Sequence, residues 1–383
     1  MTDLLHTITA GQSLSLGSQG TPSLSTVSEI DNAWLVAADG TTAVPLKSST
    51  QQAPHLSMGY RLGASRPAQR QGFSTHGLGG QSLQQLAKGG ASGRYEQSIA
   101  AVQAAHDVEV AASRTYAVEA IHWIQGEADQ TFDVSTAAYL AGLTALVGDY
   151  IADIGAITGQ SIIPFIGSQT ATWAYYNQPA RIGLAQLEAA RTLPGVYLVG
   201  GQYQFPYADR LHLTNVGYYR LGELHARAQQ RVIDTGDWPT FAPVEYTVTP
   251  SYIDVRYDVP TGSLEFDTTI VSAQPDMGFS LANTEANITA VSIINTDTVR
   301  LALSQPITEP VAQVGYGVAY DNTSVGLGNL CDSTTTTSVH DGTRIANWAL
   351  HSLDTLDVPN PFAYEVSAMY FVGPAGKLYP VTP

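Results

Sequence analysis

The order of secondary-structure patterns along the chain constrains the fold most strongly. Up to about residue 240, short apolar runs of β-forming residues alternate with longer segments that have helical spacing. Such alternation is typical of parallel strands joined by crossover helices. The candidate strands are Leu4–Ala10, Gln71–His76, Val118–Ile124, Ser161–Gly167 and Val196–Gly200. This part of the chain therefore predicts an α/β fold with a five-stranded parallel sheet flanked by helices.

The pattern changes after the segment DTGDWPTFAP. From Val244 onward, short runs of alternating polarity are separated by Pro, Gly, Asn and Asp, which is typical of an antiparallel β-sandwich. A chain of 383 residues also exceeds the usual size of a single domain. We therefore expect an α/β domain over 1–240 and a β-sandwich accessory domain over 245–383. The second domain would bind glycan or serve assembly, including contact between identical subunits.

Composition excludes several classes of partner. The net charge of -16 argues against nucleic acid and anionic membranes, because such partners require Lys and Arg. The single cysteine, Cys331, excludes an intramolecular disulfide and a Cys-based zinc site. The N-terminus lacks the features of a signal peptide, and we expect no apolar run of membrane-spanning length. The sequence thus predicts a soluble chain, for which export by a route other than Sec and association with a virion stay open.

Polar and glycine-containing segments follow four of the predicted strands. Open α/β sheets bind ligands beyond the carboxyl ends of their strands, so these segments are expected to meet at one edge. They supply a hydroxyl, a glycine turn, an amide beside a carboxylate, and an Asp-x-x-His pair. In chain order, the segments are GQS, GLGGQSL, WIQGEAD and QYQFPYADRLHLTN.

These groups are the parts that acyl transfer requires. A serine hydroxyl is a weak nucleophile and needs a neutral imidazole to take its proton, which favours Ser13 with His212. Asp209, three residues before His212, could hold the other ring nitrogen. The oxyanion would be stabilised by the Ser13 backbone N–H, a backbone N–H of Gly79 or Gly80, and the side-chain amide of Gln125.

The blocks TAGQSLSLG, GLGGQSLQQL, WIQGEAD and DRLHLTNVGYYRLGE resemble, in this order, the four conserved blocks of SGNH hydrolases. More narrowly, they resemble the sialate O-acetylesterase-like and acetylxylan-esterase-like carbohydrate esterases. The resemblance covers about residues 1–235 and implies a flavodoxin-like catalytic domain with Ser13 as nucleophile and His212 as base. It also implies an oxyanion hole that includes Gln125. Asp209 is the usual triad acid, but some members of this branch rely on the glutamate of the third block, here Glu127.

Substrate contacts are the least constrained part of the site. Five aromatic residues near the ends of the fourth and fifth strands could stack on sugar rings, although loop packing explains them equally well. They are Trp173, Tyr175, Tyr176, Tyr203 and Tyr207. Arg61 and Arg66 could recognise the carboxylate of an acidic sugar. Asp129 with Glu127 could be a metal pair, but a site without metal or other cofactor is favoured.

The sequence therefore predicts a serine esterase that removes O-acetyl groups from carbohydrate through an acetyl-Ser13 intermediate. One alternative is a lipase or thioesterase that acts on longer acyl chains with the same scaffold. Another is a glycan-binding module of a virion or phage tail with little catalysis.

Overall fold

The structure is a computed structural model, and it describes most of the chain. The described residues are 2–24, 30–42, 44–46, 52–172, 177–318, 326–358, 370–372 and 378–380.

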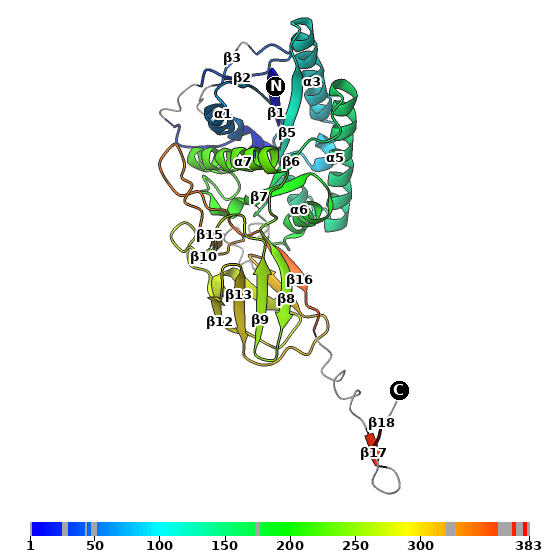
Figure 1. Cartoon of the computed structure of the whole chain (residues 1–383), viewed down its shortest axis with the longest axis vertical. Helices are drawn as coiled ribbons and strands as arrows, with labels where there is room; N and C mark the ends of the chain where they lie inside the picture. Colours follow the sequence, from blue (N-terminus) through cyan, green and yellow to red (C-terminus); the bar gives the residue numbers. More distant parts are fainter. Residues whose placement is uncertain are drawn as a thin grey trace.

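The first part of the chain is built around a seven-stranded sheet (Figure 1). The spatial order is β3-β2-β4-β1-β5-β6-β7, and every neighbouring pair except β2 and β3 is parallel. The strands are β1 (Leu4–Gly11), β2 (Ala33–Leu35), β3 (Val44–Pro45), β4 (Arg70–Gly77), β5 (Tyr116–Ile124), β6 (Phe165–Gln169) and β7 (Val196–Gly201). The parallel α/β architecture is confirmed, with β4-β1-β5-β6-β7 in the flavodoxin-like order.

The predicted number of strands was too small. The strands β2 and β3 have three and two residues, too few for the alternation by which a strand is recognised. The parallel strands therefore number six, with β3 as an antiparallel edge. The fourth predicted strand is displaced toward the C-terminus, since Pro164 has no N–H to donate and β6 begins after it.

Helices cover both faces of the sheet. On one face α1 packs beside α7, and on the other lie α3, α5 and α6 (Figure 1). The helical segments are η1 (Ser13–Leu16), α1 (Pro54–Ser65), α2 (Leu83–Leu86), α3 (Arg94–Ala111), α4 (Glu127–Thr131), α5 (Thr136–Thr158), α6 (Arg181–Thr192), η2 (Gln202–Gln204) and α7 (Asn215–Thr235). Each face has its own apolar core, so the sheet is buried on both sides.

The α5 helix corrects one expectation from the sequence. A stretch of 18 of its 23 residues has a mean hydropathy of 1.5, so by length and composition the helix could cross a membrane. In the structure it packs on the sheet through one stripe of buried side chains, among them Tyr139, Leu146 and Tyr150. An apolar segment of spanning length therefore exists, although its contacts are those of a helix that covers a sheet.

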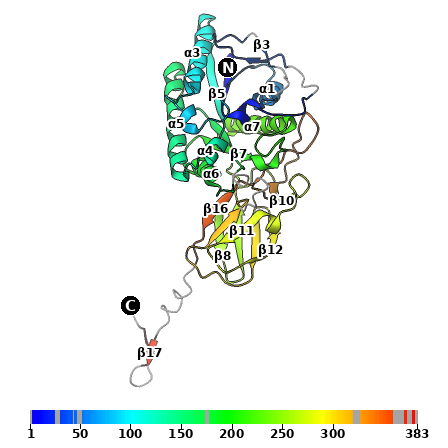
Figure 2. The ribbon, with the colours of Figure 1, turned by 180° about the vertical axis from the view of Figure 1, so that it is seen from behind.

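The second part of the chain consists of antiparallel sheets around a separate apolar core (Figure 2). A four-stranded sheet has the order β12-β13-β9-β8, a three-stranded sheet has the order β11-β14-β16, and β10 pairs with β15. The elements are β8 (Pro243–Val248), β9 (Tyr252–Tyr257), β10 (Leu264–Phe266), η3 (Pro275–Gly278), β11 (Phe279–Ala282), β12 (Ile288–Ile293), β13 (Thr298–Leu303), β14 (Gln313–Tyr316), β15 (Leu330–Asp332), β16 (Ser352–Thr355), β17 (Tyr370–Val372) and β18 (Leu378–Pro380). The expected antiparallel architecture is confirmed.

The chain between β15 and β16 returns to the α/β part and packs against it. Its Trp348 is buried beside Tyr203 of η2, and Ile345 joins the core that α7 covers. The side-chain amide of Gln169 on β6 donates to the carbonyl of His351, whose N–H donates back to Gln169. The two parts thus share an extensive interior, and the proposed boundary at 240–245 stays a prediction.

Candidate active site

A sharp turn at the end of β1 positions Ser13. Gly11 has a φ of 138°, and a Cβ atom there would lie 2.0 Å from the carbonyl oxygen of Ile124 on β5. Only glycine fits such a conformation and such a close approach. Ser13 then begins η1 and is 8% exposed, so its hydroxyl lies at the carboxyl edge of the sheet with little access to water.

Ser13, His212 and Asp209 form one hydrogen-bonded row. The Nε2 atom of His212 lies 3.1 Å from the Ser13 Oγ, and its Nδ1 atom lies 2.9 Å from the Asp209 Oδ2. The loop folds back on itself, because the Ala208 N–H donates to the His212 carbonyl and Tyr207 bridges to Leu213. If Nδ1 carries the proton donated to Asp209, Nε2 is free to accept the serine proton.

Asp209 is arranged to stay ionised. Partial burial raises the pKa of Asp209, but three hydrogen bonds together outweigh it. They come from the backbone N–H and the ring of His212 and from the Leu211 N–H, and the pKa lies below its ordinary value. Because 49% of the carboxylate side chain is exposed, water also solvates it.

The glycine turn after β4 lies against the serine. A Cβ atom on Gly79 would stand 3.6 Å from the Ser13 Cβ, with no other atom of the described residues within 4 Å. Gly80 has a φ of 72° and open space around it. Among the described residues, neither glycine N–H finds an acceptor. The N–H of Ser13 opens a helical turn, where backbone donors lack an intrahelical partner.

Gln125 is held differently from the sequence-based expectation. Its amide nitrogen donates to the Asp129 carboxylate and to the Gln81 carbonyl, and its oxygen accepts from the Tyr139 hydroxyl. The side chain is fully buried. Both N–H groups that would face an oxyanion are therefore directed toward protein acceptors, and Gln125 instead joins the loop after β5 to its neighbours.

Glu127 is also buried, at 1% exposure, and forms no hydrogen bond to His212. Its Oε1 accepts from the Thr170 hydroxyl at 2.8 Å, while its Oε2 has no partner among the described residues. Burial raises the pKa of Glu127, although Thr170 and the nearby His212 oppose the rise. Burial raises the pKa of Tyr207, and the charge of Glu127 adds to the rise. The buried Tyr207 hydroxyl also has no hydrogen-bond partner among the described residues. The Glu127 Oε2 and the Tyr207 hydroxyl are thus two buried oxygens of the site without a hydrogen-bond partner among the described residues.

Gln12 connects the serine turn to the loop that carries Glu127. Its side-chain oxygen accepts from the backbone N–H groups of Gly126 and Ala128, at 3.4 and 3.1 Å. These donors open α4, where no carbonyl of the helix can reach them. The residue that follows Gly11 therefore fixes the first and third sequence blocks against each other.

The predicted sugar-binding aromatics divide into three groups. Trp173, Tyr175 and Tyr176 lie outside the described residues. Tyr203 is 3% exposed and donates its hydroxyl to the Ala349 carbonyl at 2.7 Å, so its ring serves packing between the two parts of the chain rather than substrate. Tyr207 lies next to the catalytic row, on the strand-like turn before Asp209.

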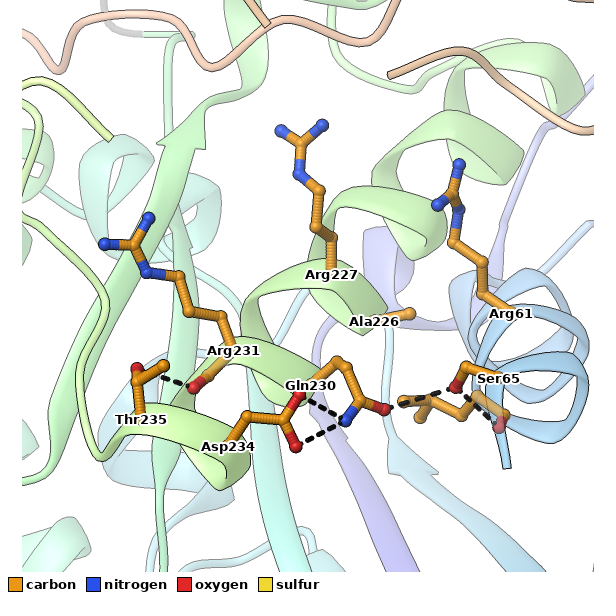
Figure 3. Close-up of a pocket in the computed structure, with 9 residues that line it drawn as sticks. Arg61, Ser65, Ala226, Arg227, Gln230, Arg231, Asp234 and Thr235 are labelled. Carbon is orange, nitrogen blue, oxygen red and sulfur yellow. Dashed lines mark hydrogen bonds between the residues drawn. The ribbon is translucent and has the colours of Figure 1, made fainter. Parts of the chain in front are cut away.

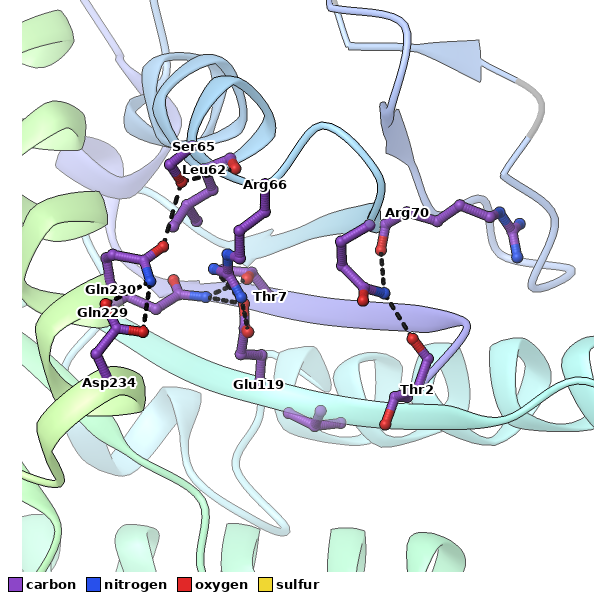
Figure 4. Close-up of polar contacts among 12 residues, drawn as sticks. Thr2, Thr7, Leu62, Ser65, Arg66, Arg70, Glu119, Gln229, Gln230 and Asp234 are labelled. Atoms are coloured by element: carbon purple, nitrogen blue, oxygen red, sulfur yellow. Dashed lines mark hydrogen bonds and ion pairs between the residues drawn. The ribbon is translucent and has the colours of Figure 1, made fainter.

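The two arginines singled out in the sequence do not converge on Ser13. Arg61 lies on α1 beside a cavity that α7 also lines (Figure 3). Arg66 forms a two-point ion pair with Glu119 on β5, and Gln229 of α7 donates to the same carboxylate (Figure 4). The guanidinium of Arg66 therefore binds the Glu119 carboxylate within the protein.

Among the described residues, no group of three or more His, Cys, Asp or Glu side chains could hold a metal ion. Asp129, the candidate partner of Glu127, instead accepts from the Leu83 N–H at 2.7 Å and from Gln125. Its carboxylate connects the loop after β5 with α2.

Sequence reasoning missed the residues that support the site from behind. Thr170 directly follows β6, so a correct end for that strand would have placed it at the ligand edge. Tyr139 and Gln186 bond to Gln125 from α5 and α6. No local pattern distinguishes these two from other buried polar residues of amphipathic helices.

Comparison with known proteins finds a sequence family that matches the α/β part and solved structures that have a similar fold. The sequence model of a family described as "Carbohydrate esterase, sialic acid-specific acetylesterase" matches residues 16–231. No curated protein matches the chain significantly. Among solved structures, a carbohydrate acetylesterase from Xanthomonas citri superposes with a TM-score of 0.59 at 16% identity, covering 91% of this chain and 80% of its own.

Two further solved structures align over a shorter part of the chain. A protein of Arabidopsis thaliana has a TM-score of 0.45 at 16% identity and covers 60% of this chain and 98% of its own. An acetyl xylan esterase from Geobacillus stearothermophilus has a TM-score of 0.35 at 13% identity, with 58% and 93% covered. The Xanthomonas protein, which aligns with 91% of this chain, shares its fold.

Proposed function

Because the chain belongs to the carbohydrate esterase family of sialic acid-specific acetylesterases, we propose that it removes O-acetyl groups from carbohydrate with Ser13 as the nucleophile. The observation that carries the proposal is the row Ser13, His212 and Asp209, with contacts of 3.1 and 2.9 Å at the ligand edge of the sheet. A hydroxyl, an imidazole and a carboxylate in this order are the groups that acyl transfer by serine requires.

The reaction proceeds in two displacements. His212 takes the proton of the Ser13 hydroxyl while the Ser13 Oγ attacks the acetyl carbonyl carbon. His212 then gives that proton to the sugar oxygen as the sugar leaves. Water then attacks the acetyl-Ser13 ester, again giving a proton to His212, and acetate leaves as Ser13 recovers its hydrogen. Asp209 holds the imidazole in place and stabilises its cation in both steps.

The oxyanion of each tetrahedral intermediate is stabilised by the backbone N–H groups of Ser13 and Gly79. Gly79 lies against the nucleophile and its N–H has no protein acceptor among the described residues. One such donor is typically worth about 3–4 kcal/mol of the barrier. We propose that Gln125, whose amide is occupied, acts by fixing the loop after β5.

Neither alternative reading of the sequence gains a supporting observation. The family match is to acetylesterases, so a preference for long acyl chains has no support from it. The comparisons lend no support to association with a phage tail. Contact between identical subunits through the C-terminal part stays a prediction.

The proposal is tested by acetate release from a panel of acetylated sialosides, xylans, pectins and bacterial capsules. The wild-type protein should release acetate from at least one class, and Ser13→Ala should reduce that rate to background. Ser15→Ala is the matched control, because Ser15 lies on the same turn with its hydroxyl bonded to the Gln12 carbonyl. Wild-type rates in Ser13→Ala would refute the assignment.

A further inference from the structure

The glycine turn after β4 (residues 78–81) is held by hydrogen bonds at its two ends and by little packing between them. At its start, the Leu78 N–H donates to the Gly11 carbonyl at 3.0 Å. At its centre, a Cβ atom on Gly80 would have no described atom within 4 Å, and one on Gly79 would meet only the Cβ of the nucleophile. Two successive glycines give a flexible backbone, so the bonds at the ends decide where the Gly79 N–H lies.

The far end of the turn is held by Asp129 on α4. The Asp129 Oδ2 accepts from the Leu83 N–H, at 2.7 Å, and from the side-chain amide of Gln125. That amide also donates to the Gln81 carbonyl at 3.2 Å. Asp129 is 3% exposed, so water competes little for these bonds. One carboxylate oxygen thus fixes the main chain at Leu83 directly and at Gln81 through Gln125.

The same region of the chain also holds the serine turn. The Gln12 side chain accepts from the N–H groups of Gly126 and Ala128, at 3.4 and 3.1 Å. The backbone N–H of Gln12 donates to the Ile124 carbonyl at 3.0 Å. The loop after β5 and α4 are therefore bonded to both turns that carry the proposed oxyanion donors, and the distance between the two donors depends on these bonds.

We infer that Asp129 is a positioning residue for the proposed reaction: it holds the glycine turn so that the N–H groups of Gly79 and Ser13 converge on one oxyanion. The inference rests on the proposed function. A donor stabilises an oxyanion only within about 2.7–3.1 Å of the oxygen that develops the charge, so a small displacement of the turn is costly. Asp129 and the catalytic row, all within the described part of the chain, share no hydrogen bond. The row should therefore stay in place without Asp129.

The first test is substitution of Asp129 with steady-state kinetics on an aryl acetate. In Asp129→Ala, kcat should fall at least roughly tenfold, toward the roughly 10²–10³-fold loss that follows removal of a whole donor. KM and the pH dependence of kcat/KM should stay as in wild type, because neither substrate binding nor the titration of His212 depends on the turn. Asp129→Asn should restore most of the rate, since both bonds go to one oxygen and an amide oxygen can accept them.

Inhibition by methylboronic acid gives a second readout, which reports the oxyanion hole directly. The Ser13 oxygen bonds to boron, its proton goes to His212, and the boron becomes a tetrahedral anion with an oxygen in the place of the oxyanion. The inhibition constant should rise at least roughly tenfold in Asp129→Ala and return toward the wild-type value in Asp129→Asn.

Glu223→Ala is the matched control, because Glu223 is also a buried carboxylate that accepts from a main-chain N–H, that of Val339. It should lose stability in denaturant unfolding while kcat stays unchanged. If Asp129→Ala does not fold, Leu83→Pro removes the same bond from the side of the donor. Leu83 is the first residue of α2, where proline is tolerated, and Ser82 before it has extended backbone. Both readouts should then change as expected for Asp129→Ala.

The inference is overturned if the folded variant keeps the wild-type kcat and inhibition constant, or if its pH profile shifts, which would place the effect on His212. A higher kcat would also overturn it, since Asp129 would then withhold the Gln125 amide from the oxyanion. Failure of the proposed function looks different, because the wild-type protein would then neither release acetate nor be inhibited by the boronate. In that case the inference falls together with the proposed function.

Discussion

Two carboxylates lie near His212, and their surroundings assign them different roles. Asp209 is hydrogen-bonded to the ring, and its pKa lies below the ordinary value because its N–H partners outweigh the effect of burial. Glu127 is buried without a bond to the ring, and burial raises its pKa. Only an ionised partner can stabilise the imidazolium, so we assign Asp209 as the triad acid in the proposed mechanism.

Substitution of each carboxylate by its amide separates the two roles. Asp209→Asn should reduce kcat by roughly 10²–10⁴-fold, because the imidazole loses its orientation and its counter-charge. Glu127→Gln keeps an oxygen for Thr170 and should reduce kcat by less than roughly tenfold. Steady-state kinetics on an aryl acetate measures both. A greater loss in Glu127→Gln would transfer the triad role to Glu127.

Glu127 should also make stability depend on pH. Its pKa in the folded protein is above its ordinary value of 4.5, so the folded state keeps a proton that the unfolded state releases. Stability therefore decreases as pH rises from about 4.5 through the folded pKa. Glu127→Gln removes the titrating carboxyl group and with it this pH dependence. Denaturant unfolding at a series of pH values should therefore show the variant gaining stability relative to wild type as pH rises. A constant difference would show that the folded carboxyl ionises normally.

At the residue scale, the sequence predicted the row Ser13, His212 and Asp209 because carboxyl ends of parallel strands must meet at one edge. It did not predict how Gln125 is occupied. The partner Tyr139 comes from α5, and its contact depends on how that helix packs on the sheet. Packing of this kind has no counterpart in local sequence.

At the scale of elements, the turn between β1 and η1 depends on one glycine. Gly11→Ala would place its Cβ 2.0 Å from the Ile124 carbonyl in a conformation that L-residues avoid. Gly159, the residue after α5, also has a positive φ, of 77°, but has open space around it. An alanine at Gly159 would therefore have an unfavourable backbone conformation only, whereas an alanine at Gly11 would also collide with a neighbouring strand.

We predict that Gly159→Ala costs about 1–2 kcal/mol of unfolding free energy, from strain alone. Gly11→Ala should cost more and should also lower kcat, because the turn that carries Ser13 must move away from β5. Denaturant unfolding with kinetics on an aryl acetate measures both effects. Equal costs in the two variants, with kcat unchanged, would contradict the proposed role of the turn.

Element boundaries were predicted where apolar periodicity is long and missed where it is short. The strands β1, β4, β5 and β7 were placed within two residues of their observed ends. The strands β2 and β3 were not predicted, because they pair through only two or three residues at the edge of the sheet. Their position is set by the neighbouring strand rather than by their own sequence.

At the scale of the whole molecule, the C-terminal part is joined to the α/β part by more than a linker. Ile345, Trp348 and Leu350 are buried in cores shared with the α/β part. The Glu223 carboxylate on α7 accepts from the Val339 N–H at 2.8 Å. The change of pattern after residue 240 predicted two architectures but could not show that a polar, Thr-rich segment between β15 and β16 returns to cover the first.

A chain that ends at residue 240 should therefore be unstable. Each of the three lost apolar side chains contributes about 1.5–3 kcal/mol by burial, and the total stability of a domain is about 5–15 kcal/mol. Circular dichroism during heating should show no cooperative transition for residues 1–240, in contrast to the full chain. A fragment that unfolds cooperatively and keeps esterase activity would show that the two parts are independent.

The central claim is that Ser13 carries the acetyl group during turnover. Rapid quenching of the enzyme with an aryl acetate, followed by mass spectrometry of the digested protein, measures this directly. We predict a burst of phenol and one acetyl group on the peptide that contains Ser13, both absent in Ser13→Ala. Acetate release by wild type with an acetyl group on another residue, or with an unchanged burst in Ser13→Ala, would contradict the account.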